Sequence, residues 1–203
     1  MESTLSQLFK TKISRGQLLV GGAATSAAVA AALAPGIVAA ADAPAGGQSL
    51  NLDVCCDGRT LRFDNGIGSG PTRGAAFIVN GKIFASGTFG SNPDALSPDS
   101  AGSIGTWVCR GNWFYDLAEV AKGKTPHVAT TQYYIFDDGS MLVSDGLEGG
   151  VKTVRVVTGG AGKYTGSRGS GSENEVSKNS TMLQLATGVA LPAPNIVFSF
   201  NLM

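Results

Sequence analysis

The stretch "VVTGGAGKYTGSRGSG", residues 156–171, decides the fold, because its six glycines and three bulky polar side chains fit several kinds of loop. A dinucleotide-binding loop must lie between a strand and a helix, yet no helical period follows residue 171. A phosphate-binding P-loop requires Gly-Lys-Ser/Thr, whereas Gly162-Lys163 is followed by Tyr164. The stretch is therefore predicted to be a hairpin. "TVRVVTGG" ends one strand, "KYTGSRGSG" begins the return strand, and the glycines between them supply positive φ angles.

The rest of the chain from residue 50 onward is also typical of strands. "LNLDVCCDGRTLRF" (50–63), "AAFIVNGKIFASGTF" (75–89) and "DDGSMLVSDGLEGG" (137–150) each contain an Asp-Gly or Asn-Gly pair, which predicts a tight hairpin turn. Only "LAEVAKGKTP" (117–126) has the composition of a helical turn. Many short strands joined by tight turns favour an all-β closed antiparallel barrel or a sandwich. An eight-stranded barrel has room inside for side chains or for one small ligand.

Residues 159–169, "GGAGKYTGSRG", resemble the signature Gly-Gly-Thr-Gly-Lys-Phe-x-x-Ala-Arg-Gly of dirigent proteins. They are also similar to the Gly-Gly-x-Gly-x-Phe/Tyr-x-Gly segment of allene oxide cyclases, which share that fold. Ala161, Tyr164 and Ser167 replace the usual Thr, Phe and Ala. The resemblance implies an eight-stranded antiparallel β-barrel over residues 50–203.

The same resemblance implies a function without metal or nucleotide. Allene oxide cyclases steer the ring closure of an unstable epoxide in an apolar barrel, and dirigent proteins steer the coupling or cyclisation of phenolic intermediates. We therefore expect a barrel that binds a small hydrophobic molecule and guides its cyclisation or isomerisation, with no cofactor. The alternative is a non-catalytic secreted barrel with a ligand-binding or structural role. A tightly filled interior would favour that alternative, and a homo-oligomer is open in either case.

The first forty residues have the layout of an export signal. Three basic residues between positions 10 and 15 precede an uncharged run at 18–40, which ends in small residues. We expect a signal peptide at 1–41, a flexible lead at 42–49 and the barrel domain at 50–203, in the periplasm or outside the cell. A retained membrane anchor is the alternative, but a run rich in Ala and Gly inserts only weakly into lipid.

The export route is open. "SRGQLL" (14–19) resembles the twin-arginine motif Ser-Arg-Arg-x-Phe-Leu, with Gly16 in place of the second arginine. The general secretory route fits the same segment. No stable membrane insertion is expected after cleavage.

Four residues are candidates for the site. Arg168 matches the arginine of the dirigent signature and could bind a carboxylate or polarise a carbonyl. Glu148, at a strand end beside two glycines, could be a general acid, although a solvated residue at the rim is the alternative. Tyr133 and Tyr134 must face opposite sides of their strand, so one of them is expected to line the interior.

Other side chains have simpler expected roles. Trp107 and Trp113 are expected in the barrel wall or core, where they could also line an apolar site. His127, the one histidine, is expected at the surface and cannot build an imidazole-rich metal site. The 15 basic and 15 acidic residues balance, which gives no electrostatic reason to expect nucleic acid or an anionic membrane as a partner.

Three cysteines leave the redox chemistry open. Cys55 and Cys56 are adjacent, so only one of them can readily face Cys109 in a disulfide. Cys56 shares parity with Leu52 and Val54, which favours Cys56 as the inward-facing thiol. An exported protein permits a disulfide, and one thiol would then be left over.

Overall fold

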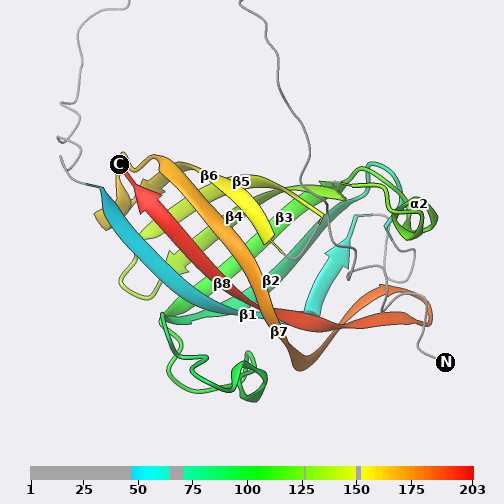
Figure 1. The fold of residues 1–203 in the computed structure, drawn as a ribbon, viewed down its shortest axis with the longest axis horizontal. Helices are drawn as coiled ribbons and strands as arrows, with labels where there is room; N and C mark the ends of the chain where they lie inside the picture. Colours follow the sequence, from blue (N-terminus) through cyan, green and yellow to red (C-terminus); the bar gives the residue numbers. More distant parts are fainter. Residues whose placement is uncertain (1–46, 65–70, 126, 150–151) are drawn as a thin grey trace, which may run out of the picture.

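A computed structural model describes residues 47–64, 71–125, 127–149 and 152–203. Within these ranges the chain forms one closed antiparallel barrel, in which each strand pairs with the next and β8 pairs with β1 (Figure 1). The strands are β1 (Gln48–Phe63), β2 (Ala76–Ala85), β3 (Gly105–Trp113), β4 (Val128–Phe136), β5 (Met141–Glu148), β6 (Lys152–Ala161), β7 (Gly169–Ala186) and β8 (Val189–Leu202). The predicted eight-stranded antiparallel barrel is confirmed.

Short helices occupy the connections. The 3₁₀ turn η1 (Pro93–Ala95) lies between β2 and β3, and η2 (Gly162–Tyr164) lies between β6 and β7. Helix α2 (Leu117–Ala121) falls within the predicted helical segment and begins with a capping box between Asp116 and Glu119. None of the helices in the described ranges has the length and apolar character needed to cross a bilayer.

Alternation along each strand divides the barrel into a wall and an interior. In β4 the residues Val128, Thr130, Gln132, Tyr134 and Phe136 are all buried, whereas the residues between them are half-buried or exposed. Tyr134 therefore faces the interior and the neighbouring Tyr133 faces outward, which confirms the expected opposition of the two tyrosines.

Aromatic side chains fill one end of the interior. The rings of Phe198 and Phe200 on β8 stack with centroids 6.0 Å apart, and the ring of Tyr134 meets each of them edge-on at 5.2 and 5.1 Å. Leu52 and Leu142 complete this fully buried layer. Burying one such side chain stabilises the fold by about 1.5–3 kcal/mol, so this end is a packed core.

The hairpin of β7 and β8 continues past the strands that flank it, and Figure 1 shows it in orange and red extending beyond the barrel. β6 pairs only with residues 169–174 of β7, while β7 and β8 remain paired as far as Ala186 and Val189. β1 supports this arm: the Gly58 amide donates to Thr181 Oγ1 at 3.0 Å, and Asn179 Nδ2 donates to the Cys56 carbonyl at 2.9 Å. The arm thus brings its leucines to one open end of the barrel.

Two of the three predicted tight turns are wrong. Asp138-Gly139 does turn between β4 and β5, with Gly139 at a φ of 81°. β1 instead runs through Asp57-Gly58, and β2 runs through Asn80-Gly81. A Cβ on Gly58 would lie 2.4 Å from the backbone of Met182, and one on Gly81 would lie 2.5 Å from the Cys55 carbonyl. These glycines permit close approach of neighbouring strands rather than a reversal of the chain.

The glycine-rich stretch does connect two antiparallel strands, but the details differ from the prediction. β6 extends to Ala161, and the return strand begins at Gly169 rather than near Lys163. Within residues 159–162, Gly162 alone has a positive φ, of 62°. The intervening residues form η2 and place the buried Tyr164 ring 5.3 Å from that of Phe136.

All three cysteines are buried and free. Cys56 and Cys109 both face the interior, as expected for Cys56, but β2 lies between their strands, with Gly81 paired to Cys56 and Val79 paired to Cys109. Two strand spacings separate the backbones by about 9–10 Å, beyond the roughly 7 Å that a disulfide spans. The disulfide considered for Cys109 does not form in this arrangement.

Cys55 faces outward and is nevertheless buried. It packs in a second cluster with Phe84 and Phe89, against Leu96. Burial raises the pKa of the Cys55 thiol to about 12, with the Asp53 carboxylate adding to the shift. This thiol is therefore a structural apolar group rather than a nucleophile.

Candidate functional site: an apolar cavity with a buried carboxylate pair

A cavity of about 210 Å³ occupies the end of the barrel opposite the aromatic layer. The ends of β3, β4 and β5 lie side by side there, and Val128 on β4 pairs with Trp113 on β3 and with Glu148 on β5. The β7–β8 arm contributes three leucines to its lining, Leu183, Leu185 and Leu191. The remaining described residues of the lining are Cys56, Leu61, Phe63, Phe77, Val79, Trp107, Cys109, His127, Gly149, Thr153, Glu173, Glu175, Pro194 and Ile196.

Aromatic rings form one wall of this cavity. The Phe63 and Phe77 rings lie 6.4 Å apart, and the Phe77 and Trp113 rings 6.5 Å apart. Trp107 also lines the cavity. The expectation that the two tryptophans lie in the wall or core is confirmed, and they supply the large apolar surface that small-molecule sites use.

Two glutamates of the lining are held by one arginine. Arg155 on β6 is fully buried, and its Nη1 donates to Glu148 Oε1 and to Glu173 Oε2, both at 2.9 Å. Gln132 Nε2 donates to the same two oxygens, each at 3.0 Å. A single guanidinium and a single amide thus hold the two carboxylates beside each other.

Further hydrogen bonds fix Arg155 in place. Its Nε donates to Ser144 Oγ at 2.8 Å, and its Nη2 donates to the Ser144 carbonyl at 3.2 Å. Nη1 and Nη2 both donate to Thr130 Oγ1 at 3.1 Å, and the Thr130 hydroxyl in turn donates to Glu148. A buried arginine with this many acceptors has one geometry available, so it positions the carboxylates rigidly.

The acceptor side of Gln132 is fixed as well. Its Oε1 accepts from the Trp107 indole at 3.0 Å and from the Tyr134 hydroxyl at 2.7 Å. This orients the amide so that its Nε2 points at the two glutamates. In the described ranges no buried side-chain nitrogen or oxygen lacks a hydrogen bond, so the network is complete.

The electrostatics favour a proton on Glu173. Burial, and secondarily the neighbouring charge of Glu148, raise the pKa of Glu173 to about 8 despite the opposing effect of Arg155. Near neutral pH Glu173 is thus a carboxylic acid beside an arginine, a state that can give up a proton. Burial likewise raises the pKa of the Cys56 and Cys109 thiols, which remain protonated in the cavity wall.

Of the four candidate residues, the structure brings Glu148 and Tyr134 together. Glu148 is the last residue of β5 and lines the cavity. Tyr134 is fully buried and does not line the cavity, and its hydroxyl is linked to Glu148 through Gln132 and through Ser144 and Arg155. Burial holds the pKa of the Tyr134 hydroxyl well above its usual range, so this hydroxyl acts as a hydrogen-bond donor.

Tyr133 and Arg168 lie elsewhere. The ring of Tyr133 is on the outer wall, 5.2 Å from the Arg110 guanidinium. Arg168 is exposed at the opposite end of the barrel, where its backbone pairs with Met203 and its Nη1 donates to the Ser167 carbonyl at 2.9 Å. Neither side chain lines the cavity.

The expectation that His127 lies at the surface is wrong. His127 is buried and lines the cavity, and its amide donates to the Glu148 carbonyl at 2.6 Å. Burial lowers the pKa of His127, so the ring is neutral near pH 7. In the described ranges no group of three or more His, Cys, Asp or Glu is arranged to hold a metal ion.

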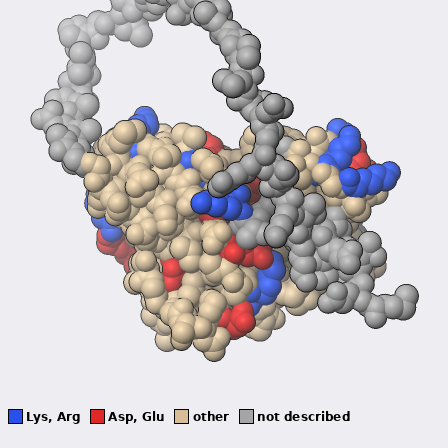
Figure 2. Space-filling model, viewed as in Figure 1, with Lys and Arg blue, Asp and Glu red and all other residues tan. Residues whose placement is uncertain are grey.

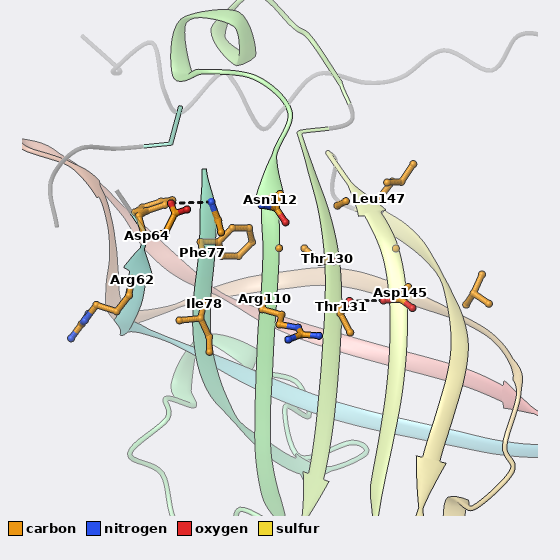
Figure 3. A pocket seen from close by; sticks show the side chains of 16 residues that line it. Arg62, Asp64, Phe77, Ile78, Arg110, Asn112, Thr130, Thr131, Asp145 and Leu147 are labelled. Carbon is orange, nitrogen blue, oxygen red and sulfur yellow. Dashed lines mark hydrogen bonds between the residues drawn. The ribbon is translucent and has the colours of Figure 1, made fainter. Parts of the chain in front are cut away.

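A larger hollow of about 950 Å³ lies on the outer wall of β2 to β6 (Figure 3). Several polar groups that line it bond to one another or to nearby backbone: Thr131 Oγ1 donates to Asp145 at 2.6 Å, and Arg62 donates to the Arg59 and Leu61 carbonyls. Among the described residues of its lining, none of those with a charge is buried. The interior cavity, with its buried ionisable cluster, is therefore the stronger candidate site.

The fold and this site together define a closed β-barrel whose lumen has apolar walls and a cluster of buried charged groups at one end. Among solved structures, the chain is similar to the pterocarpan synthase dirigent proteins GePTS1 (9% identity, TM-score 0.50) and PsPTS1 (13% identity, TM-score 0.50). Each match covers 77% of this chain, and 84% and 96% of those chains. A pyocyanin demethylase matches over 77% of this chain and all of its own, at 13% identity and a TM-score of 0.49.

These likenesses establish a dirigent-like barrel fold for the chain. No known protein family and no curated protein sequence matches it.

Proposed function

We propose that this protein is an exported barrel that binds a small hydrophobic molecule in its lumen and guides the isomerisation or cyclisation of that molecule by proton transfer. One observation carries the proposal: the apolar cavity ends at a buried pair of carboxylates, Glu148 and Glu173, which a single arginine clamps. Apolar walls that converge on a few polar groups are the usual form of a small-molecule site. The proposed export rests on the basic and uncharged segments that begin the sequence.

In the proposed reaction Glu173 gives its proton to one atom of the bound molecule and Glu148 accepts a proton from another. The composition of the molecule is unchanged, as isomerisation and cyclisation require. Arg155 stabilises the negative charge that Glu173 acquires, at a Nη1–Oε2 distance of 2.9 Å. The apolar walls hold the molecule for reaction by shape.

Binding is tested with tert-butylbenzene, a neutral apolar probe, titrated into the full chain while tryptophan fluorescence is recorded. Val128 lies between Trp113 and Glu148, so Val128→Phe should fill the cavity and abolish the fluorescence change. Val154→Phe is the matched control, because Val154 is 72% exposed and does not line the cavity. Equal binding by both variants, each folded by circular dichroism, would place the probe outside the lumen and contradict the proposal.

Proton transfer is tested on the molecule that native mass spectrometry finds on protein purified from its source. Incubation in D₂O should introduce deuterium into that molecule with the wild-type chain and not with Glu173→Gln, which keeps the shape of the side chain. A retained molecule that takes up no deuterium with the wild-type chain would instead identify a carrier. The filled aromatic end of the barrel, which leaves a cavity of only about 210 Å³, is the observation that favours this second function.

A further inference from the structure

The charges around the cavity do not balance. Among the described residues that line it or pair with its carboxylates, Glu148, Glu173 and Glu175 are acidic, and Arg155 and Lys178 are basic. Lys178 Nζ lies 2.7 Å from Glu175 Oε2, so that pair is neutral. Glu148 and Glu173 have one arginine between them. The cluster therefore lacks one positive charge whenever both carboxylates are ionised.

Burial makes this missing charge costly. The side chains of Glu148 and Glu173 are 22% and 13% exposed, and Arg155 is fully enclosed. A buried carboxylate without a counter-charge is destabilised. A proton on Glu173 relieves the imbalance, and a cationic group of a bound molecule would do the same.

The aromatic wall favours the second way of supplying that charge. Trp113 on β3 and Glu148 on β5 both pair with Val128 on β4. Their backbones therefore lie two strand spacings apart, about 10 Å. Its ring continues into those of Phe77 and Phe63, and Trp107 lines the same space. Aromatic faces attract organic cations, most strongly where water is excluded. An anionic molecule would meet two carboxylates, with the arginine already engaged behind them.

We propose that the ligand of this cavity is a hydrophobic nitrogen base that is bound as its cation, with the cationic centre between the aromatic wall and the Glu148–Glu173 pair. This inference rests on the proposed function, since it names the chemical class of the molecule that the lumen binds. A neutral base entering the cavity takes the proton of Glu173 onto its nitrogen, so one N–H bond forms as one O–H bond breaks. A permanent cation instead expels that proton to solvent.

The inference predicts a specific dependence on pH. The other titratable groups around Glu173 are Cys56 on β1, Cys109 on β3, His127 and Tyr134 at β4, Glu148 on β5, Arg155 on β6, and Glu175 and Lys178 on β7. The thiols and Tyr134 have raised pKa values and stay neutral, and the lowered pKa of His127 keeps its ring neutral above about pH 6.5. Between that pH and 8, Glu173 is the group expected to lose a proton on binding a cation.

Three probes of similar size test the inference on the full chain by isothermal titration calorimetry: phenyltrimethylammonium, its neutral isostere tert-butylbenzene, and benzenesulfonate. At pH 8.5 the cation should bind at least ~10-fold more tightly than the isostere, a difference of about 1.4 kcal/mol. Benzenesulfonate should not bind. From pH 6.5 to 8 the Kd of the cation should fall by about tenfold per pH unit, because one proton is displaced. The Kd of tert-butylbenzene should not change over that range.

Variants separate the charge from the shape of the site. Glu173→Gln should reduce cation binding to the level of tert-butylbenzene and remove its pH dependence, while leaving the neutral probe unaffected. Asp94→Asn is the matched control, because this exposed carboxylate lies outside the cavity lining. Binding of tert-butylbenzene without preference for the cation overturns the inference and leaves the proposed function standing. If none of the probes binds, both are contradicted.

Discussion

Arg155 carries a charge inside the barrel and accounts for the position of both glutamates. Burial opposes that charge, but Coulomb interactions with neighbours that include Glu173 and Glu148 outweigh it, and the pKa of Arg155 is raised. Glu148 Oε1 and Glu173 Oε2 each lie 2.9 Å from Arg155 Nη1. Without the guanidinium, two partly buried carboxylates would lose their counter-charge.

Arg155→Met should therefore destabilise the protein strongly. Removing one member of a buried ionic cluster costs about 3–5 kcal/mol, because the remaining charges lose their partner. The urea midpoint of the variant should fall accordingly. Arg59→Met is the control: Arg59 pairs with Asp57 and Asp99 at the surface, and solvent screens that interaction. Equal midpoints for Arg155→Met and Arg59→Met would mean that the buried cluster contributes nothing to stability.

Sequence alone identified part of this cluster, and the reason lies in strand parity. Glu148 and Tyr134 were predicted as site candidates, and both belong to the network. Arg155 was missed because in "TVRVV" the apolar Val154 and Val156 share one face, which a hydrophobic pattern would turn inward. They are in fact 72% and 56% exposed, and Arg155 faces the lumen. A strand that buries its charge and exposes its valines gives no local signal of doing so.

At the scale of the strands, a glycine leaves space in the interior for a large side chain of the neighbouring strand. Gly81 on β2 lies between Cys56 on β1 and Trp107 on β3. A Cβ at this position would stand 3.0 Å from the Trp107 ring and 2.5 Å from the Cys55 carbonyl. The Trp107 indole, which orients Gln132, depends on that space. The strand thus contributes to the site by lacking a side chain.

Gly81→Ala should lower stability and shift the Trp107 environment. Overpacking a closely packed position typically costs about 1–3 kcal/mol, and the backbone carbonyl at Cys55 cannot rotate away. Urea unfolding and the tryptophan emission maximum measure the two effects. Gly159→Ala is the matched control, since its Cβ would have only ordinary contact, at 3.9 Å from Arg168. A Gly81→Ala protein as stable as Gly159→Ala would refute this role for Gly81.

The same glycine explains why the turns and strand boundaries were predicted less well than the barrel itself. Asn80-Gly81 and Asp57-Gly58 have the composition of hairpin turns, but a glycine also serves where a neighbouring strand approaches closely. Which of these uses applies depends on residues distant in the sequence, such as Met182 beside Gly58. Asp138-Gly139 turns as expected because the strands on either side of it pair with each other.

For the whole molecule, closure of the sheet separates one buried charged cluster from the charges on the surface. On the face seen in Figure 2, acidic and basic side chains of both signs lie scattered among uncharged ones. Inside, the charges are concentrated in one cluster at one end, above a layer of packed aromatic rings. The predicted closed barrel thus holds, while the position of the site within it depends on how the two ends of the lumen are filled.

This arrangement predicts that stability changes with pH through the buried acid. Glu173 has a pKa of about 8 in the folded protein, against about 4.3 in an unfolded chain. Between those values the unfolded state has lost a proton that the folded state keeps, so the free energy of unfolding should fall as pH rises. The slope from this group is at most about 1.4 kcal/mol per pH unit. His127, whose pKa is lowered on folding, acts in the opposite direction, with stability lost as pH falls below 6.5.

The difference between wild type and Glu173→Gln isolates the contribution of Glu173, because both proteins retain His127. Urea unfolding at pH 5 and at pH 8 should show a larger loss of stability at pH 8 for the wild type than for the variant, which has no acid to ionise. Thr153→Ser, a conservative change of a neutral lining residue, should follow the wild type. An equal change in the free energy of unfolding between pH 5 and pH 8 in Glu173→Gln and in the wild type would mean that Glu173 does not hold its proton in the folded state. Its assignment as the proton donor of the cavity would then fail.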